Sequence, residues 1–141
     1  MPKIQFIFLL FALALFACTR YDVSTPDTSA NRAGFEQRLG VKPTADVKGV
    51  YFYADELGGD VKFQLRFECS QKTIDAIASH LGLTAAAPPE NRLRGRDDLG
   101  WWKEQSLKAL ACYWKADGQK YFRFLWYDAA KGEAFYLEYS M

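Results

Sequence analysis

Histidine and the short motifs of catalysis are what this sequence has least of. Its 141 residues include one histidine, His80, which has no second histidine at the spacing of a zinc-binding helix. The sequence also has no GxSxG nucleophile elbow, no glycine-rich phosphate loop and no CxxC pair. We therefore expect a domain that is not an enzyme, with no catalytic residues, no metal and no cofactor.

Two acidic clusters are the remaining candidates for chemistry. Asp55, Glu56 and Asp60 lack the alternating pattern and the final bidentate glutamate of a calcium loop, so a hairpin loop is the better interpretation. Asp97 and Asp98 are adjacent and follow three arginines, which favours solvated ion pairs over an acid–base couple. A small envelope hydrolase or ligand carrier that uses the carboxylates near the stretch 83–100 is the alternative function, and it requires His80 to converge with them.

The N-terminus has the pattern of an export signal. Lys3 supplies a positive charge, Ile4 to Phe16 form an apolar run of 13 residues, and Ala17 is a small residue at the end of that run. A membrane-spanning helix needs about 20 apolar residues, so this run is too short to cross a bilayer. The pattern predicts a signal peptide over residues 1–17.

The last four residues of this pattern, Leu15-Phe16-Ala17-Cys18, resemble the lipobox of bacterial lipoproteins. The resemblance covers residues 1–18 only. It implies cleavage between Ala17 and Cys18, a diacylglyceryl group on the Cys18 thiol and an acyl chain on its new amine. Thr19, in place of aspartate, resembles the outer-membrane sorting pattern of Gram-negative lipoproteins. Two or more acyl chains hold a protein stably on a membrane, whereas one chain is marginal.

Removal of residues 1–17 leaves a chain of one domain's length with balanced charge. The remaining 124 residues carry 17 basic and 17 acidic side chains, so no net field attracts nucleic acid. Residues 18–30 are polar and have little to bury, which predicts a flexible tether. We expect a single folded domain over residues 31–141, in the periplasm and close to the outer membrane.

Hydrophobic periodicity in the first half of the domain predicts a helix, two strands and a second helix. Phe35 and Leu39 lie four apart before Gly40, which indicates a short helix over 30–39. Residues 50–54 are β-branched and aromatic, and residues 61–69 alternate between an apolar face and a face of Lys62, Gln64, Arg66 and Glu68 that should meet water. Ser70 and Gly82 bracket an amphipathic helix, which we expect to cover the apolar face of the sheet.

Three further strands are expected in the second half, over 107–115, 120–128 and 134–140. The Asp117-Gly118 dipeptide predicts a two-residue hairpin turn, which would pair Tyr113 with Phe122 and Ala111 with Phe124. Both faces of this hairpin would carry aromatic residues, so it is either covered on both sides or shows aromatics to solvent. The fold class is α+β: an antiparallel sheet of about five strands, with one main helix and a short N-terminal helix on one face.

The irregular stretch 83–100 and the two tryptophans that follow it form the candidate partner-binding surface. Trp101 and Trp102 cannot both point inward, and tryptophan and arginine dominate binding hot spots. The surface would consist of Arg92, Arg94, Arg96, Trp101 and Trp102. Such a surface would contact a protein, peptidoglycan or lipid headgroups. The leading hypothesis is a protein partner, which makes the domain an assembly factor, an inhibitor or an immunity-type protein. A solvated loop, with the arginines balanced by acidic neighbours, is the competing interpretation.

Cysteine usage leaves one pair. If Cys18 carries lipid, Cys69 and Cys112 remain in an oxidising compartment. A disulfide between them is compatible with the pattern, and so are two separately buried thiols, because small free cysteines pack well.

Overall fold

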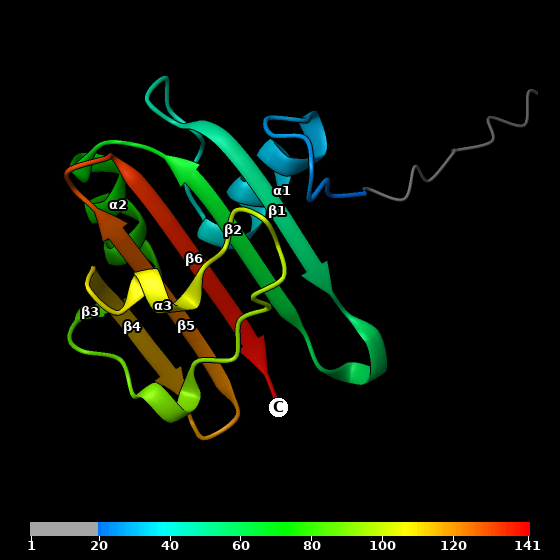
Figure 1. The fold of residues 1–141 in the computed structure, drawn as a ribbon, viewed down its shortest axis with the longest axis vertical. Coiled ribbons are helices and arrows are strands. Elements are labelled where there is room, and N and C mark those ends of the chain that lie inside the picture. Colours follow the sequence, from blue (N-terminus) through cyan, green and yellow to red (C-terminus); the bar gives the residue numbers. More distant parts are fainter. Residues whose placement is uncertain (1–19) are drawn as a thin grey trace, which may run out of the picture.

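The computed structural model describes residues 20–141, so the signal peptide and Cys18 lie outside the described residues. The chain forms one antiparallel sheet of six strands in the order β1-β2-β6-β5-β4-β3 (Figure 1). The elements in chain order are α1 (Ser29–Leu39), β1 (Lys48–Asp55), the 3-10 turn η1 (Leu57–Gly59), β2 (Lys62–Glu68), α2 (Gln71–Leu81), β3 (Thr84–Ala85), the 3-10 turn η2 (Glu90–Arg92), α3 (Glu104–Leu107), β4 (Ala111–Asp117), β5 (Tyr121–Asp128) and β6 (Glu133–Ser140).

The predicted α+β class and element order are confirmed. The sheet has one strand more than expected, because the two-residue β3 pairs with the edge of β4. The segment expected to be a strand from residue 107 begins instead with the end of α3, and β4 starts at Ala111.

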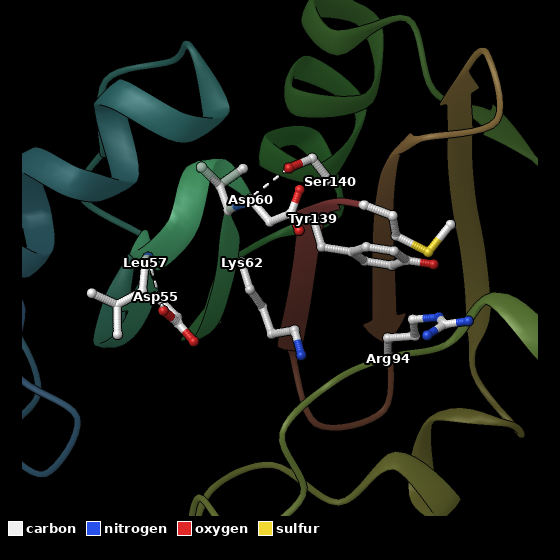
Figure 2. A pocket seen from close by; sticks show the side chains of 9 residues that line it. Asp55, Leu57, Asp60, Lys62, Arg94, Tyr139 and Ser140 are labelled. Carbon is white, nitrogen blue, oxygen red and sulfur yellow. Dashed lines mark hydrogen bonds between the residues drawn. The ribbon is translucent and has the colours of Figure 1, made fainter.

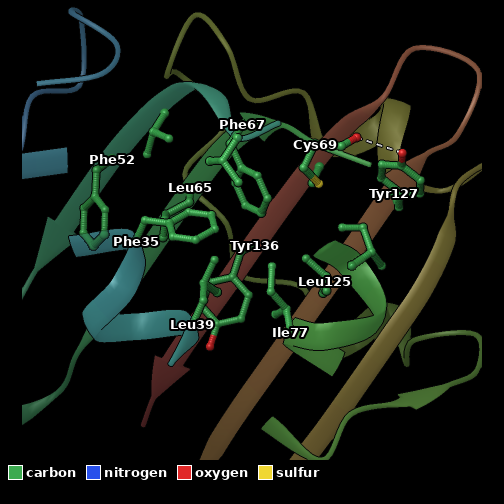
Figure 3. Packing of buried hydrophobic residues seen from close by; sticks show 14 of the residues in the cluster. Phe35, Leu39, Phe52, Leu65, Phe67, Cys69, Ile77, Leu125, Tyr127 and Tyr136 are labelled. Atoms are coloured by element: carbon green, nitrogen blue, oxygen red, sulfur yellow. Dashed lines mark hydrogen bonds between the residues drawn. The ribbon is translucent and has the colours of Figure 1, made fainter. Parts of the chain in front are cut away.

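One face of the sheet is covered by α1 and α2, as predicted. Phe35 and Leu39 of α1 and Ile74 and Ile77 of α2 are fully buried against the strands (Figure 3). Gly40 and Gly82 end the two helices in the left-handed conformation that glycine adopts at low cost. The apolar side chains of the two helices therefore pack against the strands and form the helix-side core shown in Figure 3.

The start of α2 is held by a carboxylate from an earlier loop. Ser70 occupies the expected cap position, but its hydroxyl donates to Asp46 Oδ2 at 2.8 Å instead of capping its own helix. The same carboxylate oxygen accepts from the backbone N–H of Ser70 at 2.9 Å and from the hydroxyl of Thr73 at 2.7 Å. The hydroxyl of Thr44 also donates to Asp46, and these hydrogen bonds hold the pKa of Asp46 well below its usual range. Asp46, which lies outside the helix, thus accepts hydrogen bonds from the cap residue and from the first turn of α2.

The other face of the sheet is covered by segment 83–110, which contains only β3, η2 and the four-residue α3. A second core lies beneath it. Its buried members are Leu99, Trp102, Leu107, Cys112, Phe122, Phe124, Trp126, Leu137 and Tyr139. The central strands β5 and β6 are therefore covered on both sides. Of the hairpin for which two arrangements were expected, β5 is covered on both sides, whereas Tyr113 and Trp114 of β4 are only half-buried.

The predicted pairing of β4 with β5 is wrong. Asp117 pairs with Tyr121, so the turn contains the three residues 118–120 instead of two. Tyr113 consequently lies opposite Leu125, and Ala111 lies opposite Tyr127. A register shift of three residues is odd, and an odd shift moves each side chain to the other face of the sheet. Trp114, not Tyr113, therefore shares a face with Phe124, and their rings stack at a centroid distance of 5.9 Å.

The N-terminal segment differs from the expected tether. The backbone N–H of Asp27 donates to Val50 O, and the N–H of Phe52 donates to Asp22 O at 3.4 Å. The carboxylate of Asp27 accepts from the N–H groups of Gly49 and Val50 at 2.9 and 3.1 Å. Residues 22–27 thus run along the outer edge of β1 and belong to the fold, so a flexible tether over all of 18–30 is wrong for this part.

Buried Asn31 fixes this arrangement from α1. Its amide nitrogen donates to the carbonyl oxygens of Asp22, Thr25 and Val50 at 2.9 to 3.1 Å. Its Oδ1 accepts from the N–H of Asp22 at 2.7 Å. One side chain therefore joins the N-terminal segment, α1 and β1.

Candidate functional site

Adjacent Trp101 and Trp102 point to different environments, as the sequence predicts. Trp102 is fully buried, with its ring 5.9 Å from that of Trp126 and 6.0 Å from that of Phe135. Trp101 is half-buried and its indole N–H donates to the carbonyl oxygen of Val23 at 2.7 Å. Trp102 cannot contact a partner in the folded protein, so the candidate surface retains only Trp101.

Two of the three arginines of the covering segment lie over aromatic rings of the sheet. The guanidinium of Arg92 is 5.3 Å from the centroid of Phe122, and that of Arg96 is 5.1 Å from the centroid of Tyr53. Arg96 also forms an ion pair with Asp98. Arg94 lies in a cleft beside Tyr139. The arginines are therefore spread along the covered face and do not gather around Trp101.

Trp101 instead joins residues from the N-terminal segment and from β1. Its ring stacks on Tyr51 at a centroid distance of 5.7 Å, and the guanidinium of Arg66 lies 5.8 Å from the centroid of Tyr51. Val23, with 39% of its surface exposed, is adjacent. Val23, Ser24, Tyr51, Gly100 and Trp101 line a hollow of about 360 Å³. We call Val23, Tyr51 and Trp101 the aromatic patch.

Sequence reasoning missed two members of the aromatic patch. Val23 and Trp101 are separated by 78 positions along the chain. Tyr51 belongs to the run 50–54 that predicts a strand, but this pattern does not show that its side chain is only half-buried. Only the tertiary contact between the covering segment and the β1 edge brings these residues together.

A second depression, which we call the end cleft, lies where β1, β2 and β6 meet the covering segment. It has a volume of about 410 Å³. Figure 2 shows Lys62, Arg94 and Tyr139 along it, while Leu57 at the hairpin tip points away from Arg94 and Tyr139. Among the ion pairs of residues 20–141, none involves Lys62 or Arg94. The end cleft therefore offers two cations, together with the carboxylates of Asp55 and Asp60.

The carboxylates of Asp97 and Asp98 both contact groups of their own segment. Asp97 accepts from the backbone N–H of Glu104 at 2.8 Å and so holds the start of α3. Asp98 is paired with Arg96 on an exposed part of the segment. His80 is exposed at the end of α2, on the helix-covered face, beside Gly40. His80 and the two carboxylates therefore lie on opposite sides of the sheet and do not converge.

Each face of the sheet contains one buried polar side chain that contacts its covering layer. Gln64, expected to meet water, is fully buried on the segment-covered face. Its Oε1 accepts from the backbone N–H of Arg96 at 2.7 Å, and its amide nitrogen donates to the carbonyl oxygen of Arg96 at 3.2 Å. The expectation failed because alternation identifies the second face of a strand without showing whether that face is covered.

Glu138 is the corresponding residue on the helix-covered face. It accepts a hydrogen bond from the hydroxyl of Tyr136 at 2.9 Å, a second from the hydroxyl of Tyr121, and lies 3.5 Å from Arg38 of α1. Burial raises the pKa of Glu138 to about 7, while Arg38 acts in the opposite direction. The signal for this residue is present in the sequence, since Glu138 shares a strand face with Ala134 and Tyr136.

The two cysteines of the described chain are free and buried. Cys69 belongs to the core under the helices, whereas Cys112 belongs to the core under the covering segment. The thiols lie on opposite faces of the sheet, so the arrangement is that of two separate buried thiols and not of a disulfide. Burial raises the pKa of each to about 12.

Within residues 20–141, no group of three histidine, cysteine, aspartate or glutamate side chains is placed to bind a metal ion. No helix in this part of the chain has the length and apolar character needed to span a bilayer. Comparison with models of protein families, with curated proteins and with solved structures finds no match.

Proposed function

We propose that this chain is a lipid-anchored bacterial envelope protein whose domain acts by binding a protein partner in the periplasm. The observation that carries the proposal is the aromatic patch. Tyr51 and Trp101 are held in place by stacking, a hydrogen bond and the nearby Arg66, yet both are only half-buried and line a hollow. Ordered aromatic side chains supply contact area at low entropic cost, which is why they dominate binding hot spots.

The lipid anchor rests on the lipobox resemblance at Cys18, and the docked N-terminal segment limits how far the domain can lie from that anchor. Because residues 22–27 lie along β1, only a few residues separate the fold from Cys18. A protein anchored this closely works beside one membrane surface. Its partner would be an envelope protein that reaches that surface, such as an assembly machine or a target of inhibition.

Mass spectrometry of the mature N-terminus tests the anchor. We expect the chain to begin at Cys18 with the added mass of a diacylglyceryl group and an acyl chain. Cys18→Ser should remove this added mass and release the protein from the membrane fraction. An unmodified mature N-terminus, or membrane retention of the Cys18→Ser protein, would contradict the anchor.

Crosslinking in intact cells tests the partner. We expect the unsubstituted protein to form an adduct of discrete mass that Trp101→Ala loses. Trp114→Ala is the matched control, because Trp114 is also half-buried but lies on β4, far from β1 in the strand order. Loss of the adduct in both variants would mean that it depends on stability and not on the aromatic patch. Its retention in Trp101→Ala would exclude the patch as the binding surface.

A further inference from the structure

The tip of the β1–β2 hairpin exposes the least protected apolar side chain of the described chain. Leu57 has 86% of its surface exposed, and the other exposed large apolar residues are Val23 at 39% and Met141 at 36%. Leu57 and Met141 both line the end cleft, and Val23 shares a neighbouring hollow with Glu56. Leu57 and Met141 therefore lie at one end of the sheet, and Val23 lies alongside β1 between this end and Tyr51.

The path of the N-terminal segment leads toward the same end. Asp27 contacts Val50 and Asp22 contacts Phe52, so the segment runs antiparallel to β1 and its earlier residues lie nearer the hairpin tip. Arg20 lines a hollow together with Ala54 and Glu56, the residues at the start of that tip. Covalent geometry allows about 7 Å between the α-carbons of residues 18 and 20. A lipid on Cys18 therefore enters the bilayer close to the hairpin tip.

The side-chain charges that line the end cleft and the hollow beside it are balanced. Asp55, Glu56 and Asp60 supply three negative charges, while Arg20, Lys62 and Arg94 supply three positive charges. Lys62 and Arg94 have no ion-pair partner within the described residues and can meet lipid phosphates. The neighbouring carboxylates can meet ammonium groups. This pattern fits a zwitterionic phospholipid surface better than a strongly anionic one.

We propose that the hairpin-tip end of the domain, formed by residues 55–62 with Arg94, rests on the phospholipid surface, with Leu57 inserted into the headgroup region. This inference depends on the lipid anchor of the proposed function. The anchor already confines the domain to the membrane surface. The hairpin tip therefore does not need a high affinity for lipid of its own in order to bury its apolar side chain there. The domain then has one fixed orientation, with its β5–β6 turn directed away from the membrane.

The test places an environment-sensitive fluorophore at each end of the sheet. Leu57→Cys and Ala130→Cys variants of the full chain are isolated in lipidated form, labelled and reconstituted in phosphatidylethanolamine–phosphatidylglycerol vesicles. Ala130 is the matched control, because it is exposed in the turn between β5 and β6 at the other end of the strands. Cys69 and Cys112 are buried and their thiol pKa values are raised, so the unsubstituted protein gives the labelling background.

We expect quenchers carried on lipid chains to reduce the fluorescence of the position 57 label several-fold more than that of the position 130 label. The result should be the same when the anionic lipid is omitted. Equal quenching at both positions in membrane-bound protein would overturn the inference and leave the anchor intact. Shielding of position 57 from water-soluble quenchers without lipid quenching would assign the tip to a protein contact and also overturn it. Failure of the protein to associate with vesicles would overturn both the anchor and the inference.

Discussion

The two faces of the sheet are buried equally well by layers of different kinds. On one face, α1 and α2 are regular helices of 11 residues each. On the other face, segment 83–110 has almost no regular structure, yet its own Trp102 and Trp126 of β5 beneath it are as buried as Phe67 beneath the helices. A helix satisfies its own backbone groups, whereas an irregular segment needs partners supplied from outside. Gln64 supplies two such partners to Arg96 from the sheet below.

Removal of the largest side chain that segment 83–110, the irregular layer, buries against the sheet gives the largest expected effect. Trp102→Ala should lower the free energy of unfolding by about 3 to 5 kcal/mol, because it leaves a large cavity in a closed core. Trp101→Ala is the control next in sequence, and it should cost less because Trp101 is half-buried. Chemical denaturation followed by circular dichroism measures both. A loss for Trp102→Ala no larger than that for Trp101→Ala would show that the second face is only loosely covered, and the two faces would then not be buried equally well.

The buried acid on the helix-covered face should make stability depend on pH. The pKa of Glu138 is about 7 in the folded state against a usual value of 4.5, so between these pH values the folded chain keeps a proton that the unfolded chain has lost. Its contribution is therefore fully present below pH 4.5 and is lost as the pH rises to about 7. Linkage puts this loss on the order of 3 kcal/mol.

Glu138→Gln should remove this decline, since an amide oxygen still accepts from the hydroxyl of Tyr136 but does not ionise. Denaturation midpoints measured from pH 4 to 8 provide the readout. Glu133→Gln, on the same strand but in an ion pair with Arg66, should keep the decline. An unchanged pH profile in Glu138→Gln would mean that another group titrates in this range.

The smallest expected effect concerns the attachment of the irregular layer. Gln64→Leu keeps the approximate volume of the side chain but leaves the N–H and C=O groups of Arg96 without their partner, which should cost about 1 to 3 kcal/mol. The amide of Arg96 should exchange with solvent faster and the segment 83–100 should become more sensitive to protease. Gln119→Leu, in the exposed β4–β5 turn, should change neither property. Unaltered exchange in Gln64→Leu would show that the layer is held by its apolar contacts alone.

The same difference between the faces explains what the sequence could predict. The helix-covered face was predictable because Ile74 and Ile77 repeat with the period of a helix and Phe63, Leu65 and Phe67 with that of a strand. The residues that close the other face, including Leu99, Trp102 and Leu107, follow neither period. Periodicity therefore identifies covering layers that are regular and misses those that are not.

The candidate site was predictable only in part for the same reason. The split between Trp101 and Trp102 follows from their adjacency, whereas the pairing of Trp101 with Tyr51 and Val23 depends on where an irregular segment crosses the sheet. The predicted register of β4 with β5 was wrong because the Asp117-Gly118 dipeptide indicates a turn without determining how many residues the turn contains. Gly118, with a φ of 66°, is the first of three turn residues, and the pairing begins at Asp117.

The segment along the edge of β1 determines where the domain can safely be cut. A version that begins at residue 31, the boundary set by composition, would lose the contacts of Asp22 and Asp27 and leave the N–H groups of Val50 and Phe52 unpaired. An uncovered edge strand is a template for pairing with another molecule, so such a fragment should self-associate in solution. A version that begins at Arg20 keeps the edge closed and is the appropriate form for crystallisation or solution measurements without lipid.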